Sequence, residues 1–133
     1  MADDQLGKIF THDIRALGVD YRTPAANGGV PTARCLVMVT PDAQRTMNTF
    51  LGASQHLHAS ALDPEMIRAG GILYLEGYLW DPEEPRKAMR AAIEMARAAG
   101  RKIAFTLSDG FVIERHRDDY MELINSGLID ILF

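Results

Sequence analysis

Residues 71–109 most constrain the fold, because their pattern predicts a strand, a helix and a second strand in succession. Residues 72–75 and 103–107 are short apolar runs, typical of parallel strands that are covered on both faces. Between them a helix is expected to begin close to Asp81 or Pro82 and to end at Gly100. Its buried stripe repeats at spacings of three and four residues and consists of Met89, Ala92, Ile93, Ala96 and Ala99. A right-handed crossover makes the two strands parallel, so the stretch predicts a βαβ unit.

Polar and aromatic residues directly follow both predicted strands. They are Glu76, Gly77 and Tyr78 after the first strand, and Ser108, Asp109, Gly110 and Phe111 after the second. Ligands of open parallel sheets bind beyond the carboxyl ends of the strands, which makes these residues candidates for a site. Turn and cap chemistry explains the same residue types equally well. Glu76, likewise, could orient a metal or water, or could only solvate a strand end.

The N-terminal part of the chain predicts a helix and a β-hairpin. The helix is expected to begin at Asp3 or Asp4 and to end at Gly18, with an apolar face made of Leu6, Ile9, Phe10, Ile14 and Leu17. Residues 33–39 and 45–53 predict two strands joined by residues 40–44. In the second strand Met47, Thr49 and Leu51 alternate with Thr46, Asn48 and Phe50. Since neither set is wholly polar, both faces are expected to contact other groups, as in a small β lid beside an α/β core.

Three further elements are expected along the chain. A helix begins at Asp63 and Pro64 and ends at Gly70, and a second helix follows the charged run 114–119, which is expected to be a solvated face. Residues 128–133 predict a last strand. Because an apolar parallel strand needs covering elements, both ends of the chain are expected to be cut.

Composition limits the classes of partner. The 133 residues carry a net charge of −4, and the basic residues are scattered among acidic ones. This distribution predicts no nucleic-acid partner and no membrane partner. The single cysteine excludes an internal disulfide, and the first residues do not resemble a secretory signal, so a cytoplasmic location is expected.

Few side chains suggest chemistry by themselves. His56 and His58 lie two residues apart without a third ligand nearby, so no metal site is expected there. Cys35 lies among apolar strand residues, which favours a buried, unreactive thiol over a nucleophile. Arg45 could bind a phosphate through its planar guanidinium group, or it could be a surface arginine. Gly28 and Gly29 lack the lysine and the spacing of a phosphate-binding loop and are assigned to a hinge or loop.

Several segments together resemble the ribokinase-like sugar and purine kinases, the PfkB family, and most of all its bacterial adenosine kinase-like branch. The matching segments are ADDQLGKIFTHDIRALGV, TARCLVMVTPDAQRTMNTFLGAS, LYLEGYLW, FTLSDGF and IDILF. The resemblance implies a three-layer α/β sandwich with parallel core strands and a small β lid, of which residues 1–133 are a partial domain. Lid strands are then expected at about residues 30–54, and α/β core at about 1–20 and 55–133.

The resemblance also implies a function and a set of site residues. It implies an ATP-dependent, Mg²⁺-assisted kinase that phosphorylates a hydroxymethyl group of a ribose-bearing sugar or nucleoside, and lids that could pair in a homodimer. Arg45 would approach the transferred phosphate. The residues expected to contact the substrate are Cys35, Met47, Thr49, Leu51, Tyr78 and Phe111, with Leu79 as an alternative to Tyr78.

The family's glycine-rich segment and its D-T-x-G-A-G-D signature have no counterpart in residues 1–133. This chain alone is therefore expected to lack catalytic activity, because the signature supplies the catalytic base. Glu76 and Gly77 differ from the animal purine kinases, which leaves a sugar open as the substrate. A non-catalytic, flavodoxin-like binding module is the rival interpretation.

Overall fold

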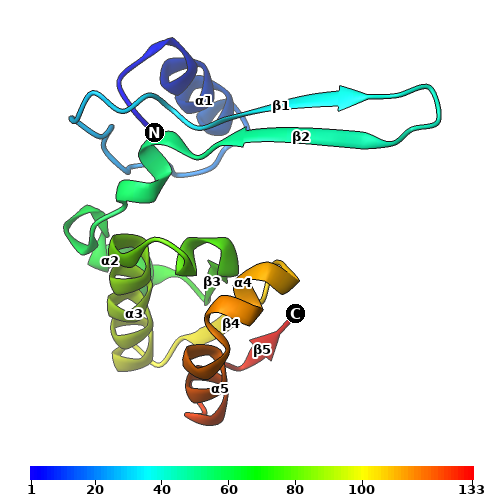
Figure 1. The fold of residues 1–133 in the computed structure, drawn as a ribbon. Helices are drawn as coiled ribbons and strands as arrows, with labels where there is room; N and C mark the ends of the chain where they lie inside the picture. The colour runs from blue at the N-terminus through cyan, green and yellow to red at the C-terminus, as the bar shows by residue number, and fades with distance from the viewer. The chain divides into compact units, whose positions relative to one another are not determined.

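The predicted strand, helix and strand are present in the computed structural model, which describes residues 1–133 (Figure 1). They are β3 (Ile72–Glu76), α3 (Glu83–Ala98) and β4 (Lys102–Thr106), and β3 pairs with β4 in parallel, with Leu75 opposite Phe105. The βαβ prediction is therefore confirmed. This unit belongs to the second of two compact parts of the chain, which are Met1–His56 and Leu57–Phe133.

Helix α3 buries the apolar stripe that its spacing predicts. Pro82 occupies the N-cap position without a side-chain hydrogen bond, and the first turn carries Glu83 and Glu84 at the positive end of the helix. Gly100 has a φ of 68°, the left-handed conformation that ends helices and favours glycine. The buried side chains of the stripe are Met89, Ala92, Ile93 and Ala96, whereas Ala99 is only half-buried.

A third strand completes the sheet, with the order β3-β4-β5. Strand β5 (Ile131–Leu132) is shorter than the predicted 128–133 and pairs with β4 in parallel. Asp130, just before β5, accepts the Ile103 amide at 2.7 Å and pairs with Arg97 of α3 at 3.0 Å. These contacts hold the entry to β5 in place, so the prediction was right about the strand but not its length.

One face of this sheet carries the hydrophobic core. Leu75, Ile103 and Phe105 pack in a single buried cluster with side chains from α3 and from α5 (Arg117–Asn125). Ile72 and Tyr74 on the other face are 54% and 57% exposed. The expectation that both faces are covered is therefore wrong for β3 within residues 1–133, because α3 and α5 pack on the same face of the sheet. In β4, Ile103, Ala104 and Phe105 are all buried, as expected.

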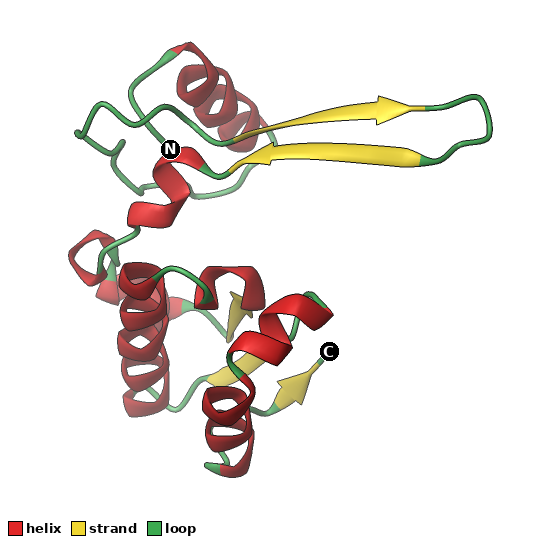
Figure 2. Ribbon diagram, in the orientation of Figure 1, coloured by secondary structure: helices red, strands yellow, loops and turns green.

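The remaining elements of this part are four short helices (Figure 2). They are η2 (Ala59–Ala61), α2 (Pro64–Ala69), η3 (Gly77–Trp80) and α4 (Gly110–Arg115). Of these, η2, α2 and η3 contact α3. Helix α2 begins and ends where predicted, with Asp63 as its N-cap and Gly70 as its C-cap. The charged run 114–119 is more than a solvated face, because Asp119 accepts the indole N–H of the buried Trp80 at 3.2 Å.

The part Met1–His56 contains a helix and the predicted hairpin. It comprises α1 (Gln5–Ala16), β1 (Arg34–Val39), β2 (Arg45–Phe50) and η1 (Gly52–His56). Asp4 caps α1 by accepting the Gly7 amide at 2.8 Å, and it also accepts the amide and hydroxyl of Thr32 at 2.8 and 2.7 Å. These hydrogen bonds lower the pKa of Asp4 to about 2, the largest cause being the Thr32 amide. Asp4 therefore joins the start of α1 to the segment that enters the hairpin.

The apolar surfaces of this first part are more exposed than the sequence predicts. Every residue of β1 and β2 is exposed, and in Figure 1 the two strands extend as a ribbon away from α1. On α1, Leu6, Ile9 and Phe10 are 43 to 50% exposed, and Phe10 packs edge-on against Tyr21. The expected burial of these faces is wrong within residues 1–133. Residues 1–20 group here with the hairpin, so their place in the α/β core stays a prediction.

No helix of the structure has the length and apolar character needed to cross a membrane.

Candidate functional site

The carboxyl ends of β3 and β4 are linked by side chains. The Ser108 hydroxyl donates to Oε1 of Glu76 and accepts the Tyr78 amide at 3.0 Å, while the Tyr74 hydroxyl donates to Oε2 of Glu76 at 3.1 Å. Both carboxylate oxygens of Glu76 are therefore engaged by protein groups. Ser108 has a φ of 68°, unusual for a residue that is not glycine, and marks a strained turn at this end of the sheet. Glu76 and Ser108 thus organise the strand ends, as the alternative of turn chemistry predicts.

Gly77 is required where β3 passes into η3. A Cβ atom there would lie 2.5 Å from the Thr106 carbonyl oxygen and 2.8 Å from that of Leu107. No side chain fits at such distances from backbone atoms of the neighbouring strand. The sequence placed Gly77 among the residues that follow the first predicted strand, and the close approach of the two strand ends is the reason that a glycine is needed there.

Tyr78 and Phe111, two predicted substrate contacts, are held by the same carboxylate. Asp109 Oδ2 accepts the Tyr78 hydroxyl at 3.4 Å, and Asp109 Oδ1 accepts the Phe111 amide at 2.9 Å as the N-cap of α4. Desolvation, followed by the charge of Asp109, raises the pKa of Tyr78. The side chains are 53% and 70% exposed. The structure therefore presents two aromatic side chains at the end of the sheet where parallel α/β proteins bind ligands.

A buried aromatic cluster supports this end of the sheet from the core. Trp80, Phe105 and Tyr120 contact one another in edge-on pairs, with ring centroids 5.4 to 5.7 Å apart. The Tyr120 hydroxyl donates to the Gly77 carbonyl at 3.1 Å, and burial raises the pKa of Tyr120 to about 12. The cluster fixes the backbone from which Tyr78 projects. The sequence did not identify this role, because Trp80 and Tyr120 are 40 positions apart.

The other four predicted substrate contacts lie on the hairpin. Cys35 is opposite Thr49, and their Sγ and Oγ1 atoms are 3.2 Å apart, so the two side chains share one face. Met47, two residues along, is 64% exposed, and Leu51, just beyond β2, is 43% exposed. The prediction that Met47 and Thr49 share a face is confirmed by the register. The expected burial of Cys35 is wrong, because no element of its part covers this face of the hairpin.

Arg45 opens β2 opposite Val39 and is exposed. Its guanidinium group makes no hydrogen bond or ion pair with another residue of the chain. A guanidinium group on an exposed strand that lacks a carboxylate partner is available to an anion.

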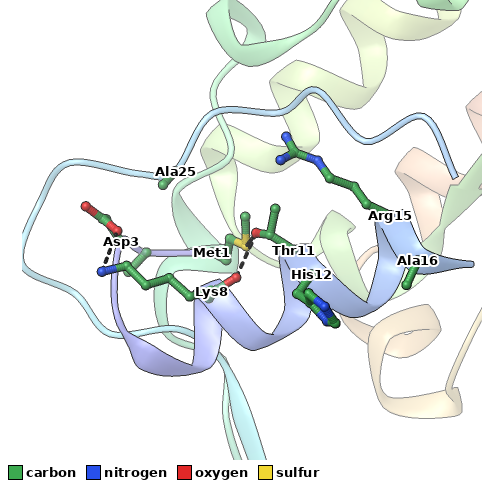
Figure 3. A pocket seen from close by; sticks show the side chains of 10 residues that line it. Met1, Asp3, Lys8, Thr11, His12, Arg15, Ala16 and Ala25 are labelled. Atoms are coloured by element: carbon green, nitrogen blue, oxygen red, sulfur yellow. Dashed lines mark hydrogen bonds and ion pairs between the residues drawn. The ribbon is translucent and has the colours of Figure 1, made fainter. Parts of the chain in front are cut away.

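Two other features stand apart from these residues. The first part of the chain has a hollow of about 640 Å³, lined by one side of α1 and by residues near Met1 and Ala25 (Figure 3). None of the predicted substrate contacts lines it.

His58 pairs with Glu84 at 3.0 Å, and residues 1–133 contain no group of three or more side chains that could hold a metal ion.

Comparison with family models decides the relationship. The model described as pfkB family carbohydrate kinase matches residues 2–133, nearly the whole chain. The chain belongs to the PfkB family of carbohydrate kinases. Its parallel sheet with covering helices is accordingly part of a ribokinase-like α/β fold.

Solved structures of kinases match nearly the whole length of the chain. Adenosine kinase from Sinorhizobium meliloti is 47% identical, with a TM-score of 0.93, over 100% of this chain and 41% of that protein. A probable sugar kinase from Rhizobium etli is 44% identical, with a TM-score of 0.91, over 99% of this chain and 40% of that protein. An E. coli protein described as a Ribokinase II, solved with ATP and Mg²⁺, shares the fold at 20% identity and a TM-score of 0.86, over 99% and 43% of the two chains.

Residues 1–133 thus span about 40% of the length of the adenosine kinase and the probable sugar kinase. A search of curated proteins found no match.

Proposed function

We propose that the complete protein containing residues 1–133 transfers a phosphoryl group from ATP to the hydroxymethyl group of a ribose-bearing nucleoside such as adenosine. The observation that carries the proposal is the 47% identity to an adenosine kinase along the entire chain. The exposed rings of Tyr78 and Phe111 support it, because aromatic side chains offer flat apolar faces to a base.

In this proposal the chain supplies a wall of the substrate cleft and a lid. Tyr78 and Phe111 contact the base, while Cys35, Met47, Thr49 and Leu51 form the substrate face of the lid. Arg45 binds the transferred phosphate, where its free guanidinium group offsets developing negative charge. The lid excludes water, which strengthens these interactions and prevents loss of the phosphoryl group to hydrolysis.

ATP and Mg²⁺ belong to the proposal for the complete protein. Residues 1–133 contain no group of three or more side chains that could hold a metal ion. In the proposal, the residues of this chain bind the substrate and exclude water from it. Magnesium, when bound with ATP, supplies charge neutralisation at the phosphates. A cytoplasmic location and pairing of two lids in a homodimer stay predictions.

A sugar without a base is the second candidate substrate. The 44% identity to a probable sugar kinase over 99% of the chain favours it almost as strongly. The two candidates differ in what the aromatic side chains do, because a sugar lacks the flat ring that Tyr78 and Phe111 would contact.

The hairpin register provides the test of the lid face. In the complete protein, Thr49→Arg should raise the KM for the nucleoside at least about tenfold, because a charged side chain must lose water to enter an apolar cleft. Asn48→Arg is the matched control, since Asn48 lies opposite Leu36 on the other face. A larger KM effect at Asn48 would show that the opposite face of the lid contacts the substrate. Melting temperatures of both variants exclude unfolding as the cause.

A further inference from the structure

Helix α4, which carries Phe111, is too short to be stable alone. It has six residues, Gly110–Arg115, and isolated helices of fewer than about twelve residues are marginal in water. Its position therefore depends on what holds its two ends. Asp109 holds the first end, through the Phe111 amide and the Tyr78 hydroxyl. Val112, buried to 2% exposure, anchors the middle.

Asp81 holds the other end of α4. This carboxylate follows η3 directly and accepts both nitrogens of the Arg115 fork, Nε at 3.0 Å and Nη2 at 2.5 Å. It also accepts Nε2 of His116 at 2.8 Å. Two hydrogen bonds from Arg115 and one from His116 to the same carboxylate fix the orientation of the end of α4 relative to Asp81, as well as its distance from Asp81.

Both ring nitrogens of His116 have a defined partner, Nε2 facing Asp81 and Nδ1 facing Arg86. Nδ1 of His116 lies 3.2 Å from Nη1 of Arg86, a group that can only donate. In this geometry Nδ1 accepts from Arg86, so Nε2 carries the hydrogen and donates a hydrogen bond to the Asp81 carboxylate. Only 15% of the His116 side chain is exposed. The same Arg86 nitrogen lies 3.5 Å from Asp119, which accepts the Trp80 indole, so the contacts continue into the aromatic cluster.

We propose that Asp81 is a positioning residue for the candidate site: by binding Arg115 and His116 it fixes α4 against η3, and so fixes Phe111 beside Tyr78. A helix of six residues is only about 9 Å long, so holding both ends leaves Phe111 little freedom. Asp81 touches no substrate in this account. The effect on substrate binding rests on the proposed function, whereas the effect on α4 does not.

The first test measures α4 itself in the 133-residue chain. The His116 amide closes the last turn of the helix on the Val112 carbonyl at 3.0 Å, and its hydrogen exchange reports opening of that turn. Asp81→Asn should accelerate this exchange at least about tenfold. Asp118→Asn makes the same chemical change at an exposed position in the first turn of α5 and should stay within about twofold. Equal exchange in the two variants overturns the proposal.

The second test measures the consequence for substrate in the complete protein. Asp81→Asn should raise the nucleoside KM about tenfold with a smaller change in kcat, because it displaces a binding group. In a Phe111→Ala background the same substitution should add less than about twofold, since the group that Asp81 positions is gone. Fully additive effects overturn the positioning role. If Asp81→Asn does not fold, Arg115→Lys replaces it, because it keeps the charge and removes the fork.

The two tests separate the proposals. A complete protein that does not phosphorylate nucleosides overturns the proposed function, and the exchange measurement still decides whether Asp81 holds α4.

Discussion

Replacing Gly77 with alanine tests how closely the two strand ends approach each other. The new Cβ would lie 2.5 Å from the Thr106 carbonyl oxygen, whereas ordinary contact begins at 3.4 Å, so the strands must separate locally by about 0.9 Å. Two of the three nearest atoms belong to the backbone and cannot rotate away. Overpacking of this kind costs about 1–3 kcal/mol. Disturbing the hydrogen bond from Tyr120 to the Gly77 carbonyl adds about 1 kcal/mol. The free energy of unfolding of the second part should therefore fall by about 2–4 kcal/mol.

Urea denaturation followed by tryptophan fluorescence measures this change. Trp80 is the only tryptophan of the chain and is fully buried beside Gly77, so its emission reports unfolding of the second part. Gly71→Ala is the matched control, because a Cβ at Gly71 meets nothing within 4 Å and its φ is not positive. That change should be neutral or stabilise the chain by up to about 1 kcal/mol. Equal midpoints for the two variants would refute the close approach at Gly77.

Two further predictions concern pH. The folded-state pKa of Tyr120, about 12, lies above its ordinary value of 10.0, so its contribution to stability is complete below pH 10 and is lost as the pH rises towards 12. Tyr120→Phe should remove this alkaline loss and destabilise the second part by about 1 kcal/mol at neutral pH, as urea denaturation at several pH values would reveal. The folded-state pKa of Asp4, about 2, lies below its ordinary 3.8, so its contribution is present above pH 3.8 and is lost as the pH falls towards 2. Asp4→Asn should weaken this acid dependence in the NMR signals of residues 1–56, whereas an unchanged acid transition would show that Asp4 does not join α1 to Thr32.

Local patterns were sufficient to predict most elements of the fold. The spacing of apolar residues in α3, the caps at Asp4 and Asp63, and the turn between the hairpin strands depend on neighbours within a few positions. The parallel pairing of β3 and β4 followed from the handedness of the crossover. These predictions succeeded because they use interactions inside one element or one connection.

Burial and long-range polar contacts were predicted less well. The apolar residues of α1, Cys35 on β1 and Tyr74 on β3 suggested covered surfaces, yet a hydrophobic pattern shows which face needs a partner and not whether residues 1–133 provide one. The link from Asp81 to Arg115 spans 34 positions and has no local signal. The charged run 114–119 looked like a solvated surface for that reason.

The most direct test of the central account is the substrate preference of the complete protein containing residues 1–133. ADP formation would be measured with ATP and Mg²⁺ against adenosine, ribose and fructose at matched concentrations, and the phosphorylated product identified by ³¹P NMR. The account predicts a kcat/KM for adenosine at least about a hundredfold above either free sugar, because base contacts of about 1–3 kcal/mol each are available only to the nucleoside. A preference for a free sugar, or ADP formation that does not depend on any of the three acceptors, would contradict it.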